Sequence, residues 1–194
     1  MRDILFGALR ASLVTWVLCG LAYPLALTGM AQWLLPSQAN GSLETDPDGR
    51  IVGSRLIGQN WNGPQWFQGR PAATTAADRE DITKGVPAPY NAADSTGSNL
   101  GPTSSRLFER LVADRASLPA DMLTASVSGL DPDISPANAA LQAARVAQAH
   151  GVGTADIEAL VARHVTRRLF GIFGEPRVNV QSLNLAMERV FPRR

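Results

Sequence analysis

"ASLVTWVLCGLAYPLALTGMAQWLL", residues 11–35, is a run of 25 residues without a charged side chain. At about 1.5 Å of rise per residue, a helix of this length covers roughly 37 Å, more than the hydrocarbon core of a bilayer at about 30 Å. A secretory signal has a shorter apolar region and small residues at a cleavage site, and only "TGMAQ" offers a weak version of such a site. The segment therefore predicts a transmembrane helix.

Charged residues around this segment predict its orientation. Arg2 and Arg10 precede it, and the next basic residue is Arg50. Short loops rich in Arg and Lys stay on the cytoplasmic side. We therefore expect residues 1–10 to form a short cytoplasmic N-terminus and residues 36–194 to lie outside the cytoplasm.

The patterns after residue 35 predict one α+β domain. Residues 36–105 are rich in Gly, Pro, Ser, Asn and Thr, which favours turns and ordered loops with short strands. Helical periodicity and capping residues follow further along the chain. We predict helices over 104–117, 136–150, 154–170 and about 182–190, and strands in "RIVGSRLIGQNW", "MLTASVSGL" (122–130) and "EPRVNV". The predicted fold is one N-terminal transmembrane helix followed by a small mixed α/β extracytoplasmic domain.

The stretch "SVSGLDPDISPANAALQAARVA", residues 126–147, has the residue types of a catalytic loop. A serine nucleophile needs a general base within hydrogen-bond reach, and neither Ser126 nor Ser128 has one beside it in the sequence. The pattern G-x-S-x-G is also missing. Ser135 and Pro136 instead predict a helix start, with Ser135 as the capping residue and Pro136 at the first helical position. We favour the helix start over catalysis.

Gln142 and Arg145 are not explained by the helix start. They are three positions apart, so they share one helical face, and together they can bind a carbonyl, a carboxylate or a phosphate. The alternative is that both are ordinary polar residues on the surface, and the sequence leaves this choice open.

The loops before this helix are candidates for binding a partner protein. "YNAADSTGSNLGPTS", residues 90–104, combines glycines with many side-chain donors, and no Gly-Lys-Ser/Thr phosphate loop occurs in the chain. "GRP" and "GEPRVNV" hold an arginine near a proline in a turn. The partner-binding candidates are Tyr90, Asn91, Ser98, Asn99, Arg70 and Asn179.

Composition excludes several classes of site. Cys19 is the single cysteine, so no intrachain disulfide and no cysteine-rich metal site can form. His150 and His164 are the only histidines, and neither stands in a metal-binding or catalytic motif. The formal net charge of +1 provides no strong positive potential that would attract nucleic acid. We expect no bound cofactor or metal, and an accessory protein rather than a free-standing enzyme.

The chain resembles the C-subunit family of the Kdp-type potassium-transporting P-type ATPase over almost its whole length. The resemblance rests on the N-terminal span and, in the family's order, on "GSRLIGQNW", "FQGRP", "YNAADSTGSNLGPTS", "LTASVSGLDPDISPANAALQAARVA" and "LFGIFGEPRVNVQSLNLA". Two small departures are Thr96 and Val127, each at a position where glycine is common in the family.

The resemblance implies a non-catalytic accessory subunit of a high-affinity, ATP-driven potassium uptake complex in the bacterial inner membrane. Its partners would be a channel-like potassium-binding subunit, a P-type ATPase subunit and a small single-span subunit, with membrane lipid around the helix. The subunit would stabilise their assembly, with its soluble domain in the periplasm.

A second proposal for the family is a catalytic chaperone, which raises the ATP affinity of the ATPase subunit through a ternary complex with ATP. In that proposal the glutamine matching Gln142 contacts ATP, and the candidate nucleotide-binding set that it implies is Gln142, Arg145, Ser128 and Gly129. The expected orientation conflicts with it, because ATP is cytoplasmic and Gln142 would lie outside. We therefore favour the assembly role and keep ATP binding as the alternative.

Overall fold

The structure is a computed structural model that describes residues 1–46, 48–81, 83–112 and 118–192. The chain divides into two compact units, residues 1–43 and residues 44–194.

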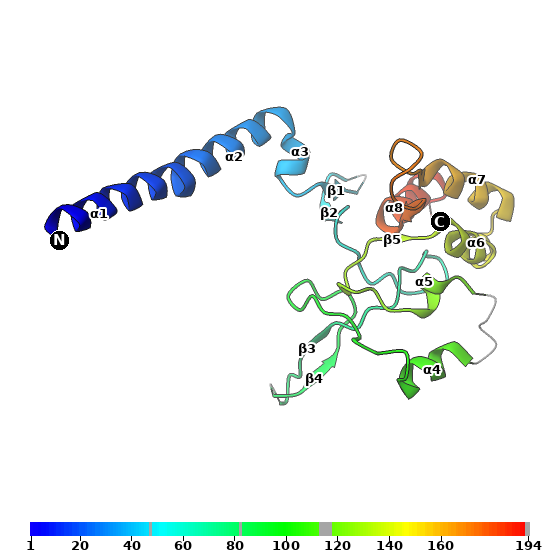
Figure 1. The fold of residues 1–194 in the computed structure, drawn as a ribbon. Helices are drawn as coiled ribbons and strands as arrows, with labels where there is room; N and C mark the ends of the chain where they lie inside the picture. The colour runs from blue at the N-terminus through cyan, green and yellow to red at the C-terminus, as the bar shows by residue number, and fades with distance from the viewer. Residues whose placement is uncertain (47, 82, 113–117, 193–194) are drawn as a thin grey trace. The chain divides into compact units, whose positions relative to one another are not determined.

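The first unit is helical from its second residue (Figure 1). Among the described residues, one helix, Arg2–Leu34, is long and apolar enough to cross a membrane, and none of its side chains is buried by the chain itself. Its middle is a π-helical turn that ends just before Pro24, which has no N–H to donate to the preceding turn. The elements are α1 (Arg2–Trp16), η1 (Val17–Ala22), α2 (Tyr23–Leu34) and α3 (Pro36–Ala39). This apolar helix suggests a single-pass membrane protein.

The second unit has its core between three helices and a small sheet. The helices are α6 (Pro136–His150), α7 (Thr154–His164) and α8 (Val180–Val190), and the antiparallel sheet has the order β5 (Asp133–Ile134), β7 (Arg177–Asn179) and β6 (Val165–Thr166). Val178 of β7 pairs with both Ile134 and Val165. The buried core comprises Phe67, Ile134, Ala139, Ala143, Val146, Ala147, Ile157, Leu160, Val161, Val178, Val180, Leu183 and Met187.

Local signals fix the ends of α6. Ser135 caps its start, since its hydroxyl accepts a hydrogen bond from the Asn138 N–H at 3.1 Å, and Pro136 follows as the first helical residue. Gly151 ends the helix in the left-handed conformation, with φ of 67°. These residues confirm the helix predicted for 136–150.

Loops and short elements make up the rest of the second unit. They include the strand pairs β1 (Leu43–Thr45) with β2 (Ile51–Ser54) and β3 (Thr75–Ala77) with β4 (Gly85–Pro87), and the helices α4 (Ser105–Val112) and α5 (Ala120–Leu123). The loop segment 63–70 contributes Phe67, which is fully buried in the core of the helices. Long-range contacts therefore join these loops to the core formed by α6, α7 and α8.

The α+β class and the N-terminal apolar helix are confirmed, and three finer predictions are wrong. The strand predicted for 122–130 is the end of α5 followed by a loop and a turn. The helix predicted for 154–170 ends at His164, because Val165–Thr166 pairs with β7. "RIVGSRLIGQNW" forms a single strand, β2. The helix predicted for 104–117 is present as α4, and residues 113–117 lie outside the described residues.

Candidate functional site

Gln142 uses its whole amide group to hold a loop. Its Oε1 accepts from the Gln68 N–H at 2.8 Å and from Arg145 Nη2 at 2.7 Å, while its Nε2 donates to the Gln68 carbonyl at 2.9 Å and to Asn138 Oδ1 at 2.7 Å. A glutamine amide has two hydrogens and two lone pairs, so all four are occupied. The side chain is buried on α6, and a ligand would have to displace one of these bonds.

Arg145 holds the same loop one turn further along α6. Its Nη1 donates to the carbonyls of Gly63 at 3.3 Å and Pro64 at 2.6 Å, and its Nη2 donates to the carbonyl of Trp66 at 3.0 Å. Burial lowers the pKa of the Arg145 guanidinium below its ordinary value. A partly buried cation that contacts three carbonyls orders the loop.

Asn184 of α8 completes this arrangement from another helix. Its Oδ1 accepts from the Phe67 N–H at 2.9 Å, and its Nδ2 donates to the Phe67 carbonyl at 2.9 Å. Two amide side chains thus replace a neighbouring strand for the consecutive residues Phe67 and Gln68. We call Gln142, Arg145 and Asn184 the amide clamp.

The Ser126–Gly129 turn hydrogen-bonds to itself. Ser126 Oγ accepts from the Gly129 N–H at 3.1 Å, and Ser128 Oγ accepts from the Leu130 N–H at 3.1 Å. Gly129 has φ of 70°, and a Cβ there would stand 2.7 Å from the carbonyl oxygen of Thr96. The two serine hydroxyls therefore shape a turn in which a side chain at position 129 would be strained and crowded.

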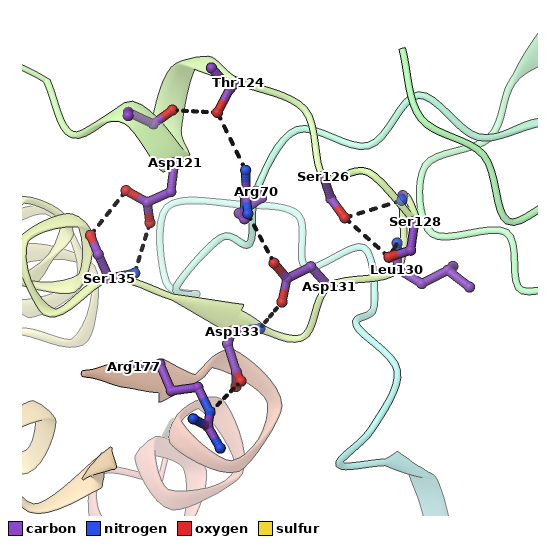
Figure 2. A network of polar contacts seen from close by, with 12 residues as sticks. Arg70, Asp121, Thr124, Ser126, Ser128, Leu130, Asp131, Asp133, Ser135 and Arg177 are labelled. Atoms are coloured by element: carbon purple, nitrogen blue, oxygen red, sulfur yellow. Dashed lines mark hydrogen bonds and ion pairs between the residues drawn. The ribbon is translucent and has the colours of Figure 1, made fainter. Parts of the chain in front are cut away.

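A network of ion pairs and hydrogen bonds lies beside this turn (Figure 2). Arg70 Nη1 lies 3.1 Å from Asp131 Oδ2, and its Nη2 donates to Thr124 Oγ1 at 3.3 Å. Asp131 Oδ1 accepts from the Asp133 N–H at 3.1 Å, and Arg177 Nε lies 2.9 Å from Asp133 Oδ2. Burial raises the pKa of Asp133, although Asn179 and Arg177 act in the opposite direction. This network connects the loop that contains Arg70 to the central strand β7.

Asp121 links α5 to the start of α6 (Figure 2). Its Oδ2 accepts from the Ser135 N–H at 2.7 Å and from Asn138 Nδ2 at 3.0 Å, and its Oδ1 accepts from Ser135 Oγ at 3.0 Å. Burial alone would raise the pKa of Asp121, but these hydrogen bonds outweigh it and lower the pKa below the ordinary value. The carboxylate is therefore stabilised in its charged form.

Tyr90 and Asn91 fold the predicted partner loop onto the segment around Arg70. The Tyr90 hydroxyl donates to the Arg70 carbonyl at 2.7 Å, and burial, with Asp131 nearby, raises the pKa of Tyr90 to about 12. Asn91 Nδ2 donates to the Thr75 carbonyl at 2.6 Å. Both side chains therefore face inward and order the loop.

The remaining partner candidates lie in different places. Ser98 is half-buried and Asn99 is exposed with φ of 51°, both in the loop after Tyr90. Asn179 caps α8, because its Oδ1 accepts from the Ser182 N–H at 3.0 Å, and its Nδ2 donates to the Arg55 carbonyl at 2.9 Å. The structure brings Arg70 and Tyr90 together, and it places Gln142 and Arg145 in a separate group.

Two open clefts border these groups. One, of about 640 Å³, has the turn and Arg70 in its wall together with apolar side chains, of which Val127 is 88% exposed and Leu56 is 64% exposed. We call it the central cleft; its lining is Leu56, Ile57, Arg70, Ser126, Val127, Ser128, Leu130, Asp131 and Pro132. The other, of about 310 Å³, is lined by Gln142, Arg145, Asn138, Met122, Gln68, Gly69 and Pro71.

Among the residues that the structure describes, the titratable side chains show no metal cluster and no serine-histidine pair at the Ser126–Gly129 turn. Within residues 1–46, 48–81, 83–112 and 118–192, no three His, Cys, Asp or Glu side chains are grouped so as to hold a metal ion. The ring nitrogens of His150 and His164 contact the backbone carbonyls of Gln65 at 3.1 Å and Leu160 at 2.9 Å. Neither contact places an imidazole as a base for Ser126 or Ser128.

Sequence reasoning missed Asn184, Asp121 and Gln68. Asn184 lies within "LNLA", where an amide in an apolar helix signals a buried polar contact. The partner of that contact, Phe67, is 117 residues away, and no local pattern could have identified it.

Comparisons with known proteins agree with one another. A family model described as "KdpC: K+-transporting ATPase, c chain" matches residues 5–189. A Potassium-transporting ATPase KdpC subunit from Bradyrhizobium diazoefficiens is 52% identical over 186 residues, covering 91% of this chain and 92% of that relative. The subunit of the same name from Methylobacterium nodulans is 51% identical over 94% of this chain and 96% of its own length. That of Rhodopseudomonas palustris (strain ATCC BAA-98 / CGA009) is 50% identical over 100% of this chain and 98% of its own length.

Proposed function

The chain belongs to the KdpC family, the c chain of the K+-transporting ATPase, and from this premise we propose that it is a non-catalytic accessory subunit that stabilises assembly of the complex. It would hold the potassium-binding subunit and the ATP-hydrolysing subunit together, with the small single-span subunit beside its membrane helix. The observation that carries the proposal is the contrast at the central cleft. There the polar side chains of Arg70, Ser126, Ser128 and Asp131 each form at least one hydrogen bond within the chain, whereas Leu56 and Val127 are exposed.

Such a surface suits docking better than chemistry. Polar groups that already have partners need no reorganisation when a protein covers them, and exposed apolar side chains gain from burial. A fixed set of loops also loses little conformational freedom on binding. The hydrogen bonds of Tyr90 and Asn91 support this fixed arrangement of loops.

We place the soluble domain on the extracytoplasmic side of the bacterial inner membrane. Arg2 and Arg10 before the apolar helix support this orientation, since basic residues stay in the cytoplasm. Excluding these two and Asp3 from the 18 basic and 17 acidic residues leaves sixteen of each for the domain. A balanced domain does not concentrate potassium by its charge, so it would act through its shape.

Charge placed in the central cleft tests the assembly role. Val127→Glu in the full chain should reduce co-purification of the other subunits by at least about tenfold, because an ionised carboxylate is costly to bury in an interface. Leu141→Glu is the matched control on α6, where Leu141 is 53% exposed and outside the cleft. Normal co-purification with Val127→Glu, in a variant that is membrane-bound and folded, would reject the cleft as the docking surface.

A topology reporter tests the orientation separately. Alkaline phosphatase fused after Arg194 should be active in intact cells, because this enzyme needs an oxidising compartment for its disulfides. A cytosolic fluorescent reporter at the same position should stay dark. The opposite pair of results would place the domain in the cytoplasm.

ATP binding is the second candidate function, and one observation favours it. Gln142 and Arg145, two members of the amide clamp, both line the cleft of about 310 Å³, and an arginine at a cleft can bind phosphate. Gln142 would have to exchange one of its four hydrogen bonds for a bond to ATP, and Arg145 would have to release a carbonyl. The assembly role requires no such exchange, so it ranks first.

A further inference from the structure

The hairpin between β6 and β7 ends in an apolar tip, Leu169–Phe173. Leu169 and Phe173 form an antiparallel bridge, with backbone hydrogen bonds of 2.8 Å and 3.0 Å between them. Leu169, Phe170, Ile172 and Phe173 are 62%, 84%, 71% and 65% exposed. Four large apolar side chains at one tip form a contiguous exposed patch, whereas the exposed apolar residues of an ordinary soluble domain are scattered singly.

The backbone of the tip is held in an unusual conformation. Phe170 has φ of 53° and Gly171 has φ of 76°. The left-handed region is natural for glycine but uncommon for a bulky residue, which loses stability there. Phe170 is almost fully exposed, so packing within the domain does not offset this loss. The strain is consistent with an aromatic side chain held outward for an external contact.

Basic residues stand directly beside the apolar tip. Arg167 and Arg168 precede it and are exposed, and Arg168 Nη2 lies 2.6 Å from Glu175 Oε2 on the other arm of the hairpin. Between residues 163 and 177 there are four arginines and one glutamate. Apolar residues flanked by arginines match the acyl chains and the anionic phosphates at the surface of a bilayer.

The length of the connecting segment limits how far the start of the second unit can lie from the apolar helix. The apolar helix ends at Leu34 and the second unit begins at Glu44. Nine intervening residues span at most about 30 Å even when fully extended. A tethered segment binds as if at high concentration, so the modest affinity of four side chains is sufficient.

We propose that Leu169–Phe173 inserts into the interfacial region of the bilayer to which the N-terminal helix anchors the chain, with Arg167 and Arg168 at the level of the lipid phosphates. This second, peripheral attachment rests on the membrane anchoring that forms part of the proposed function. It would restrict the orientation of the domain at the membrane surface.

Site-directed spin labelling of the full chain in its complex tests the insertion. Cys19→Ala removes the single cysteine, and Ile172→Cys then places one nitroxide in the tip while both phenylalanines remain. The control label is Leu141→Cys on the exposed face of α6. The complex is reconstituted in nanodiscs of phosphatidylethanolamine and phosphatidylglycerol, and collisions with oxygen and with a water-soluble nickel chelate are compared.

Insertion predicts that oxygen collisions exceed nickel collisions at 172, while nickel collisions exceed oxygen collisions at 141. Adding Phe170→Ser and Phe173→Ser should reduce the ratio of inserted to water-exposed tip by at least about tenfold, since each buried CH₂ contributes a factor of about four to this ratio. Dominant nickel collisions at 172 would overturn the proposal, because the tip would then be in water. Exclusion of both reagents would also overturn it, because the tip would then be buried against another subunit.

Alkaline carbonate extraction of the same membranes separates this inference from the anchoring on which it rests. A chain that resists extraction but carries a water-exposed label at 172 refutes only the insertion. A chain that is extracted refutes the anchor and the insertion together.

Discussion

Gln142 hydrogen-bonds to both backbone groups of Gln68, accepting from its N–H at 2.8 Å and donating to its carbonyl at 2.9 Å. The two residues are 74 positions apart. Asn184 makes the same pair of bonds to Phe67, so adjacent residues of one loop are held by side chains from two helices. The amide clamp therefore gives this loop the backbone pairing that a strand would obtain from a sheet.

Gln142→Ala should destabilise the domain and leave the ATP dependence of the complex unchanged. It removes the partners of two backbone groups of Gln68, and unsatisfied groups of this kind cost about 1–3 kcal/mol each, or about 2–6 kcal/mol together. Urea unfolding of the full chain, followed by the fluorescence of Trp61 and Trp66 next to the clamp, measures the loss.

Gln148→Ala, at an exposed position of the same helix, is the control for α6. The KM for ATP of the purified complex is measured for both variants. A raised KM with unchanged stability would contradict the clamp and favour the nucleotide-binding interpretation of Gln142.

Gly129→Ala should be more destabilising than Gly151→Ala, although both glycines have a left-handed φ, of 70° and 67°. At Gly151 the new Cβ meets nothing within 4 Å, so only the conformational cost of about 1 kcal/mol applies. At Gly129 it would lie 2.7 Å from the Thr96 carbonyl oxygen, which adds overpacking of about 1–3 kcal/mol. Thermal unfolding of the two variants side by side measures the difference, and equal losses would show that the turn rearranges freely.

Asp121 should contribute stability that depends on pH. Its pKa is lowered in the folded state, so its contribution is complete above the ordinary value of 3.8 and is lost as pH falls through the folded-state pKa. Asp121→Asn should therefore be less stable than the wild type at pH 6, and the gap should narrow as the pH falls toward 3. Urea midpoints across this range measure the gap, with Glu158→Gln on the exposed face of α7 as the control. A gap that does not change with pH would show that the carboxylate charge is unimportant.

Local chemistry explains which parts of the fold were predictable. The capping hydroxyl of Ser135, the ring of Pro136 and the left-handed Gly151 act within a few residues, so the bounds of α6 followed from the sequence. The uncharged run over residues 11–35 likewise predicted the apolar helix, which extends to Arg2 because the first turns contain helix-compatible residues.

Long-range pairing explains what was not predictable. The helical periodicity of 154–170 continues past His164, but Val165 and Thr166 pair instead with Val178 and Arg177 of β7. The alternating pattern of 122–130 resembles a strand, yet the hydroxyls of Ser126 and Ser128 bond within the turn. In both places a tertiary or side-chain bond overrides the local pattern.

Long-range contacts also limited what the sequence could predict about the candidate site. The spacing of Gln142 and Arg145 correctly placed them on one helical face, where Arg145 Nη2 bonds to Gln142 Oε1 at 2.7 Å. That they hold the loop 63–68 depends on contacts 74 to 82 residues apart. A sequence pattern on a helix can identify a polar pair but not the group that the pair binds.

Tyr90→Phe should be less stable than the wild type at neutral pH and should lose this deficit at strongly alkaline pH. At pH 8 the variant lacks the hydrogen bond to the Arg70 carbonyl and should be less stable by about 1 kcal/mol. The folded-state pKa of Tyr90 is raised to about 12, chiefly by burial, so the neutral phenol stabilises the fold below pH 10. That contribution falls as pH rises from 10 to 12 because the unfolded chain ionises first.

Phenylalanine has no such ionisation, so the stability difference should shrink above pH 10 and disappear or reverse by about pH 11.5. Urea unfolding at pH 8, 10 and 11.5 measures it, with Tyr23→Phe in the apolar helix as the control that leaves the pH dependence of the domain unchanged. If wild type and Tyr90→Phe kept a constant difference across this range, the phenol would ionise equally easily in both states. The loop of residues 90–104 would then not be closed over Arg70 in solution.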